Sequence, residues 1–362
     1  MGAWLAWHAR RVRQTNPTPM ARPSGAAAWH NRVSTHDERR AMPAILTHDL
    51  FGRESLDEVR DLLGFRTDDE TDAFLLGNQG PDPLFYLVID PLMRKWSPLG
   101  NAMHAARPAL LLLAMREAAA GLEGRERTLA RAYVAGFACH WLLDSTVHPL
   151  VYHWQNGICD AGVEGLDERA ASKVHAEIER DLDEAVLFSL TGQTVATYRP
   201  HARTLAASHE VLAAVDKVYF YVALWVYGKA IDPRTFSTAA IEFRLVQRVF
   251  DSPGGRKRAV IGTLERALGR TPFSLVCAMS HRDRADTRSA FDNREHGAWE
   301  NPFTGEVSED GFWDLWARAR GRVGEVIPGL CSPDIDLAAM RELTGDLSFE
   351  GAPSAPDAPF TW

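Results

Sequence analysis

The pattern of apolar residues along this chain predicts helices. Between residues 205 and 228, apolar side chains recur at steps of three and four, which is the spacing of one buried helix face; they are Leu212, Val215, Val218, Tyr219 and Val222. We interpret them as core positions. The first predicted helix begins at Asp49 or Ser55 and ends at about Leu63. Further helices are expected over residues 103–122, 126–147, 168–190, 238–250, 256–268 and 309–323.

Proline and glycine separate these helices with turns and loops. The run Gly80-Pro81-Asp82-Pro83 predicts a tight, rigid turn. One loop is expected to begin at residues 152–154. Others are expected over residues 88–101, 191–204 and 281–296, the last of them exposed. The expected organisation is a disordered leader or mis-assigned start over residues 1–41, a helical domain over residues 42–344 and a disordered tail over residues 345–362.

Composition is that of a globular protein, with 46% hydrophobic and 24% charged residues among 362. No run of about 18 apolar residues is present, so no transmembrane helix is expected. The four cysteines form no CxxC pair, which favours a reducing, cytoplasmic location without a disulfide framework. Motifs of P-loop, dinucleotide-binding and nucleophile-elbow enzymes are missing from the sequence.

Charge is unevenly distributed along the chain. The net charge is −8, but seven arginines against two acidic residues give residues 1–41 a net charge of +5, which leaves −13 for residues 42–362. An acidic body argues against broad binding of nucleic-acid backbones, and no specific nucleic-acid partner is indicated. The leader lacks the apolar region of a secretory signal. Met42 is therefore a candidate start, which would leave a free amine at Pro43.

Three residues able to bind a metal follow one another at steps of four: His140, Asp144 and His148. Side chains four apart lie on one face of a helix, one turn above another, and here apolar residues surround them. Pro149 disfavours helical geometry at His148, so we expect the helix to end there. Neutral imidazole and carboxylate are ligands that zinc accepts in the absence of cysteine. The alternative is a core histidine that pairs with the aspartate.

A second pair, His175 and Glu179, repeats this spacing in the predicted helix 168–190. Two such side chains reach one ion from consecutive turns. An exposed polar pair is the alternative interpretation. Glu177 lies off that face, and Asp181 and Asp183 are expected to be charges in solvent.

Three further candidates stand in other segments of the chain. The turn at Gly80 holds Asp82 at a fixed place, either near a metal or bonded to its own backbone. His48 stands near the start of the first predicted helix, where a capping or surface role is the alternative. His104 stands at the start of the predicted helix 103–122.

These candidates form an ordered set of motifs, which consists of Thr47-His48, Gly80-Pro81-Asp82, Met103-His104, His140-x3-Asp144-x3-His148-Pro149 and His175-x3-Glu179. Together they resemble the bacterial zinc-dependent phospholipase C family, in its uncharacterised intracellular branch. The segment Asn301-Pro302-Phe303-Thr304-Gly305-Glu306 is also similar to that branch. The resemblance covers about Met42 to Val323 and extends distantly to the single-strand-specific zinc nucleases. The ordered combination is more specific than any single motif.

The resemblance implies an all-α fold, a single multi-helix domain of the phospholipase C/zinc nuclease type, with two or three zinc ions. It implies one ion on His104, His140 and Asp144, with Asp82 beside or on it. It implies a second ion on His148, His175 and Glu179. A third ion would use His48, a shared Asp144 and the mature N-terminal amine and carbonyl. The residues before Met42 and the short stretch from Pro43 to His48 depart from the family pattern at this third site.

The activity that the resemblance implies is a zinc-dependent phosphodiester hydrolase acting on a phospholipid or a small phosphodiester. Metal-bound hydroxide would attack phosphorus in line, and Asp82 would orient the nucleophile or act as general base. The related nucleases favour Asp where Glu179 stands, which favours the lipase-like branch. Three protein ligands per ion leave open positions, as in catalytic sites.

Other functions stay open beside this hypothesis. A zinc-dependent nuclease or phosphomonoesterase would use the same metal cluster, and a non-catalytic metal-binding helical scaffold would use the metal structurally. Iron or manganese are alternatives to zinc, because His and carboxylate sites accept several metals. Five aromatic residues could form a box for a quaternary ammonium headgroup; they are Phe85, Tyr86, Trp96, Tyr152 and Trp154. Ordinary packing at the rim and in the core is the alternative, so no choline specificity is expected.

Overall fold

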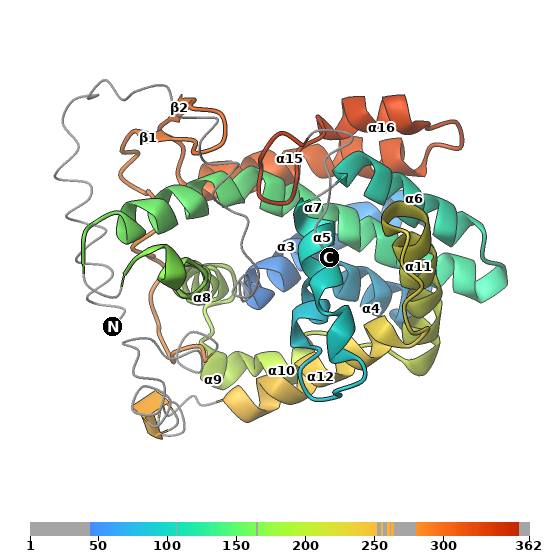
Figure 1. The fold of residues 1–362 in the computed structure, drawn as a ribbon, viewed down its shortest axis with the longest axis horizontal. Helices are drawn as coiled ribbons and strands as arrows, with labels where there is room; N and C mark the ends of the chain where they lie inside the picture. The colour runs from blue at the N-terminus through green and yellow to red at the C-terminus, as the bar shows by residue number, and fades with distance from the viewer. Residues whose placement is uncertain are drawn as a thin grey trace. The chain divides into compact units, whose positions relative to one another are not determined.

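The computed structural model describes residues 44–105, 107–163, 166–251, 255, 259–260, 262–263 and 280–354. Within these residues the fold is mostly helical, as predicted (Figure 1). The strands described are β1 (Trp299–Glu300) and β2 (Val307–Ser308), an antiparallel pair in which Trp299 pairs with Ser308. The predicted helix 256–268 falls almost entirely outside the described residues, and so do Met42 and Pro43. The predictions about a start at Met42 therefore stay predictions.

The chain divides into two compact units. Unit 1 consists of residues 1–44, 147–195 and 252–315, and unit 2 of residues 45–146, 196–251 and 316–362. The helical elements of unit 2 are α3 (Ile45–Leu63), α4 (Asp68–Gly77), η1 (Asp82–Tyr86), η2 (Arg94–Trp96), α5 (Pro98–Ala105), α6 (Pro108–Ala120), α10 (Pro200–Arg203), α11 (His209–Tyr227), α12 (Thr235–Phe250) and α16 (Leu337–Thr344). Unit 1 has η3 (Glu168–Ala170) and α8 (Ala171–Thr191), whereas α7 (Gly124–Cys159), α9 (Val195–Tyr198) and α15 (Phe312–Cys331) each have residues in both units.

Short polar signals set the start of several helices. At α4, Thr67 Oγ1 accepts a hydrogen bond from the Glu70 amide, and the Glu70 carboxylate accepts one from the Thr67 amide, which is a capping box. Ser208 caps α11 and Asp336 caps α16 in the same way, each accepting from a backbone amide three residues on. The predicted helices 168–190 and 205–228 correspond to α8 and α11. The predicted loop 191–204 instead contains the one-turn helices α9 and α10.

Two predictions that rest on proline are wrong. The expected helix 103–122 is two helices, because Pro108 opens α6 behind Arg107, whose φ of 60° breaks the helical path. Conversely, α7 passes through Pro149 and ends at Cys159, so residues 152–154 are helical and do not begin a loop. Proline removes one backbone hydrogen bond, but Leu150 and Val151 beside it are buried, and their burial compensates.

Two glycines let α4 and α7 cross at backbone contact within unit 2. A Cβ on Gly77 would lie 2.1 Å from the Tyr133 carbonyl oxygen, and a Cβ on Gly136 would lie 2.0 Å from the Phe74 carbonyl oxygen. No larger residue fits at either position without separating the helices. The crossing places the end of α4 beside the next turn of α7, which carries His140.

The C-terminal segment is ordered further than predicted. Within the expected disordered tail, residues 345–354 are packed: Leu347 forms an isolated bridge with Pro353, and the Phe349 side chain is fully buried. Trp141 Nε1 donates to the Leu347 carbonyl at 2.8 Å, and the Phe349 amide donates to the His104 carbonyl at 3.1 Å. Residues 355–362 lie outside the described part of the chain.

Candidate metal centres

All eight residues predicted as metal ligands fall into three groups whose ligand atoms lie within 4.8 Å of one another. Unit 2 holds two of these groups, which share His140, and unit 1 holds the third. The unit 2 groups are His48, His140 and Asp144, and Asp82, His104 and His140; the unit 1 group is His148, His175 and Glu179. Metal binding by these groups stays a prediction. Whether a group suits a metal ion depends on the arrangement of its residues.

In the first unit 2 group, the Asp144 carboxylate offers one oxygen to each of two histidines. Its Oδ1 lies 3.1 Å from His48 Nε2, and its Oδ2 lies 3.0 Å from His140 Nε2. His140 and Asp144 are one turn apart in α7, whereas His48 comes from the first turn of α3. The His48 and His140 rings lie 4.1 Å apart between centroids. A carboxylate with its two oxygens directed at separate imidazoles can bridge two cations or bind one.

The second unit 2 group forms around Asp82 at the start of η1. Asp82 Oδ1 lies 3.0 Å from His104 Nε2 and 4.0 Å from His140 Nε2. The turn before it is fixed by two buried tyrosines, because the Gly80 carbonyl accepts hydrogen bonds from both Tyr133 (3.2 Å) and Tyr219 (3.0 Å). The rigid placement of Asp82 expected from the turn motif therefore has support from α7 and α11.

Both unit 2 histidines that face Asp82 are oriented by a backbone carbonyl. The Nδ1 of His140 lies 3.1 Å from the Asn78 carbonyl, and the Nδ1 of His104 lies 2.8 Å from the Gly100 carbonyl. A proton on Nδ1 leaves a lone pair on Nε2, which is the arrangement that metal-binding histidines require. His140 Nε2 is buried and makes no hydrogen bond within the described residues, although Asp144 lies at ion-pair distance.

Burial has the largest effect on the pKa of both histidines. It holds the pKa of His140 below its ordinary value, although the nearby Asp144 carboxylate opposes the shift. For His104, burial also lowers the pKa, but the contact with Asp82 outweighs burial, so the pKa is raised. A buried neutral imidazole at His140 fits a metal ligand, because the coordinating form is the deprotonated one.

The unit 1 group is built from α7 and α8. Glu179 Oε1 lies 3.3 Å from His148 Nε2 and 3.4 Å from His175 Nε2, and Glu179 Oε2 is buried without a hydrogen bond in the described residues. His175 Nδ1 lies 2.8 Å from Gln155 Oε1, so Nε2 is directed at the carboxylate here too. Burial raises the pKa of Glu179, but the two histidines dominate and lower it to about 2.

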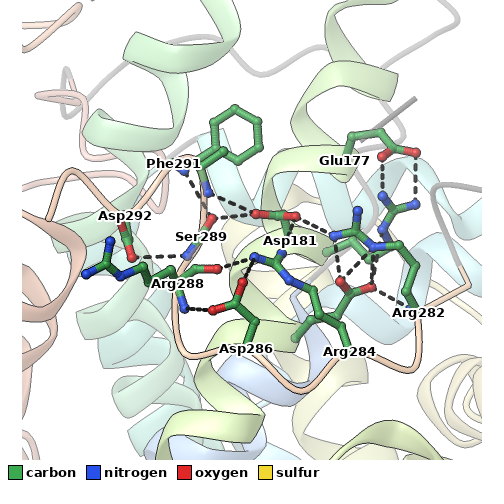
Figure 2. Close-up of polar contacts among 12 residues, drawn as sticks. Glu177, Asp181, Arg282, Arg284, Asp286, Arg288, Ser289, Phe291 and Asp292 are labelled. Carbon is green, nitrogen blue, oxygen red and sulfur yellow. Dashed lines mark hydrogen bonds and ion pairs between the residues drawn. The ribbon is translucent and has the colours of Figure 1, made fainter. Parts of the chain in front are cut away.

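Helix α8 is anchored by charges that were expected to lie in solvent. Asp181 and Asp183 are buried, and Figure 2 shows Asp181 beside Arg282 and Arg284. Asp181 Oδ1 accepts from Arg284 at 2.8 Å and also from Arg282. Burial alone would raise the pKa of Asp181, but these arginines outweigh burial and hold the pKa below its ordinary value. The exposure predicted for Asp181 and Asp183 is therefore wrong, and the loop 281–296 is buried at residues 289 and 291–293 but exposed or half-buried elsewhere.

The same loop holds α7 and α8 together within unit 1. Ser289 Oγ and the Ala290 amide donate to Asp181 Oδ2 on α8, at 2.7 and 3.1 Å. Trp154 Nε1 on α7 donates to the Phe291 carbonyl at 3.0 Å. These bonds fix the two helices that supply His148, Gln155, His175 and Glu179. No local pattern predicts this pairing, because the partners are more than 100 residues apart.

Sequence reasoning missed several supporting residues. Gln155 is seven residues after His148 and lies on the same helix face, which is a spacing that predicts it once α7 is known to continue. Phe349 packs its ring 5.1 Å from that of His104 and 5.6 Å from that of His140. No local pattern marks Phe349, because only tertiary packing brings it there.

The candidate aromatic box is mostly core. Phe85 and Tyr86 are buried, with Phe85 stacked on His104 at 5.2 Å and Tyr86 on Phe243 at 3.6 Å. Trp154 is also buried. Tyr152 lies edge-on to His175 at 5.0 Å, in the unit 1 group. These positions favour ordinary packing for three of the five aromatics.

Comparisons with known proteins identify no relative. No family model, curated protein or solved structure matches this chain. Among the described residues, no helix has the length and apolar composition required to span a bilayer. The function is therefore inferred from the metal groups themselves.

Proposed function

We propose that this chain is a metal-dependent phosphoric ester hydrolase, similar to the bacterial zinc-dependent phospholipase C family, acting on the phosphodiester of a phospholipid or of a related small molecule. The proposal rests on ligand chemistry. Each group joins at least one carboxylate to two histidines, without cysteine, within 4.8 Å. Zinc accepts this donor set, and iron and manganese are alternatives.

The single observation that carries the proposal is the bridging geometry of Asp144. Its two oxygens are directed at the Nε2 atoms of two different histidines, at 3.1 and 3.0 Å. A core aspartate that served only to pair with His140 would need one of these contacts. A buried carboxylate between two neutral imidazoles is costly to desolvate without a cation, so the group fits a bound metal.

Divalent ions supply Lewis acidity to such a site, because they lower the pKa of bound water to about 7 and neutralise charge on a phosphoryl group. The chain supplies the positioning. The Asn78 and Gly100 carbonyls fix the tautomers of His140 and His104, and the tyrosine pair fixes the turn of Asp82. Asp82 is then placed to orient an attacking water or to accept its proton.

Partial exposure favours catalysis over a purely structural role. The His104 side chain is 14% exposed and that of His148 is 13% exposed, so one member of a group in each unit reaches solvent. Each group has three protein ligands, whereas structural zinc sites are usually closed by four. A substrate oxygen can complete the coordination.

The test begins with metal content per chain, measured by elemental mass spectrometry on the full chain and on the variants His140→Ala and Asp144→Asn. His209→Ala is the control, because His209 is exposed on α11 and belongs to none of the groups. A zinc content that falls in both ligand variants and stays at the parent's level in the control supports the assignment of the unit 2 groups. Cobalt substitution adds a readout independent of turnover, because its visible absorption reports the ligand set.

Hydrolysis of a soluble phosphodiester, a phosphomonoester and single-stranded DNA then separates the candidate enzymes. Diester cleavage that the ligand variants abolish supports the proposal. Preference for DNA or for the monoester would replace it with the nuclease or phosphomonoesterase. Stoichiometric metal without turnover on any of them would identify a metal-binding scaffold, and protein that takes up no zinc would refute all three.

A further inference from the structure

A surface of unit 2 exposes six large apolar side chains on α12 and on the loop that follows the Asp82 turn. On α12, Ile241, Leu245 and Val249 lie at steps of four and are all exposed, so they form one stripe. The loop after η1 exposes Val88, Ile89 and Leu92, the last of them 78% exposed. We call this set of six residues the apolar face.

The loop and the helix are joined by a buried carboxylate. Glu242 on α12 accepts hydrogen bonds from the amides of Val88, Ile89 and Asp90, each at 2.8 Å. Next to it, Tyr86 stacks on Phe243 of α12, and Figure 1 shows this part of the chain beside α12. The loop that exposes Leu92 is therefore held rigidly against the helix, and exposure of its apolar residues is a property of the fold.

Basic residues border the apolar face. Arg244 and Arg248 lie on the α12 turns beside Ile241 and Leu245, and Arg94 and Lys95 follow Leu92 at the start of η2. Within the described residues, none of these four cations takes part in an ion pair. Because the whole chain carries −8, four cations without a carboxylate partner among the described residues, beside an apolar stripe, favour an anionic partner at this face.

We propose that the apolar face docks on the surface of an anionic phospholipid bilayer, with Leu92 inserted between headgroups and the four basic side chains on lipid phosphates. Apolar residues ringed by Lys and Arg are the pattern of proteins that lie on membranes without crossing them. This inference rests on the proposed function, because it assumes that the substrate is a phospholipid.

The apolar face connects to the candidate centre through a short rigid path. Asp82 opens η1 and Tyr86 closes it, and the exposed loop begins two residues later. The buried Phe85 stacks on His104, the partner of Asp82, at 5.2 Å. Docking at the loop therefore brings the membrane surface to the segment of unit 2 that holds the Asp82 group.

The experiment is co-sedimentation of the full chain with vesicles of phosphatidylcholine alone and of phosphatidylcholine mixed with phosphatidylglycerol, at low and high salt. We expect binding to the anionic vesicles, weakened by salt. Leu92→Glu should lower the partition coefficient by about tenfold or more, because the leucine that inserts between the headgroups is lost and a negative charge is added. Reversing the charge of both α12 arginines (R244E/R248E) should lower it by a similar factor.

Val307→Glu is the matched control, because Val307 is 71% exposed on β2, outside the apolar face. Unchanged binding of the Leu92→Glu protein, or no vesicle binding by the parent, overturns the proposal. A dimer in sedimentation velocity that Leu92→Glu dissociates, without vesicle binding, overturns it in favour of a second copy of the chain.

A soluble phosphodiester separates this inference from the proposed function. Leu92→Glu should leave its hydrolysis unchanged and reduce hydrolysis of vesicle phospholipid. If neither protein cleaves the soluble diester while the parent still binds anionic vesicles, the proposed function fails and the docking surface stands.

Discussion

Replacing Gly80 with alanine tests the candidate centre through a residue that is not itself a ligand. A Cβ at this position would lie 2.2 Å from His140 Cδ2 and 2.5 Å from its Nε2. Real contacts of a Cβ stay above 3.0 Å, so the imidazole would have to move by about 0.8 Å. Metal coordination tolerates only about 0.2 Å. Since His140 belongs to both unit 2 groups, Gly80→Ala should remove metal from unit 2.

The energetic cost has two parts. Gly80 has a φ of 52°, and alanine in this region costs about 1–2 kcal/mol. The clash with His140 adds about 1–3 kcal/mol, typical of overpacked cores. Gly64→Ala is the control for the first part alone, because Gly64 has a φ of 71° and no heavy atom within 4 Å of the added Cβ.

The assay is urea unfolding in the presence of a chelator, combined with metal content per chain. The free energy of unfolding should fall by about 2–5 kcal/mol for Gly80→Ala and by about 1–2 kcal/mol for Gly64→Ala. In a His140→Ala background, the clash is absent, so Gly80→Ala should cost no more than Gly64→Ala does in the parent. Full metal content in Gly80→Ala, or an equal cost in both backgrounds, would refute this reasoning.

Three further substitutions test other contacts. Asp144→Asn should lower the metal content of unit 2, because an amide nitrogen then faces one of the two histidines; metal content equal to the parent's would contradict the bridging role. Gln155→Ala should weaken zinc binding by the unit 1 group by about tenfold or more, because His175 loses the acceptor that orients it; a competition titration with a zinc chelator measures this, and unchanged affinity would exclude the role. Asp181→Asn should lower the free energy of unfolding by about 1.5–3 kcal/mol, because a buried carboxylate loses its charge-assisted bonds to Arg282 and Arg284, while these arginines keep Glu184 and Asp286 as partners; urea unfolding measures the loss, and a cost below about 1 kcal/mol would place Asp181 in an effectively solvated environment.

The candidate ligands on α7 and α8 could be predicted because each pair is local. His140 and Asp144, like His175 and Glu179, are separated by four residues, and helical geometry alone places them on one face. The helical class followed from the same periodicity. Where helices begin was also partly visible, since capping residues such as Thr67 and Ser208 act on amides three residues away.

What could not be predicted depends on contacts between distant segments. The burial of Asp181 requires the arginines of the loop at 282–284, about 100 residues later in the chain, and no local pattern distinguishes it from a solvent charge. Pro149 remains inside α7 because the packing of its apolar neighbours outweighs one missing hydrogen bond. The path of residues 345–354 depends on the hydrogen bond from Trp141 to Leu347. The glycines and prolines of this segment predict disorder and carry no information about that distant partner.

The two units orient their histidines with different acceptors, a backbone carbonyl in unit 2 and a side chain in unit 1. In unit 2, the acceptors for His104 and His140 are backbone carbonyls, of Gly100 and Asn78, which no side-chain substitution removes. The Asn78 carbonyl is positioned by the close approach of backbones at the crossing of α4 with α7. In unit 1, the acceptor for His175 is the Gln155 side chain, which a single substitution removes. The orientation of His140 should therefore be sensitive to volume added at Gly77 or Gly136, whereas the orientation of His175 should be sensitive to loss of the Gln155 side chain.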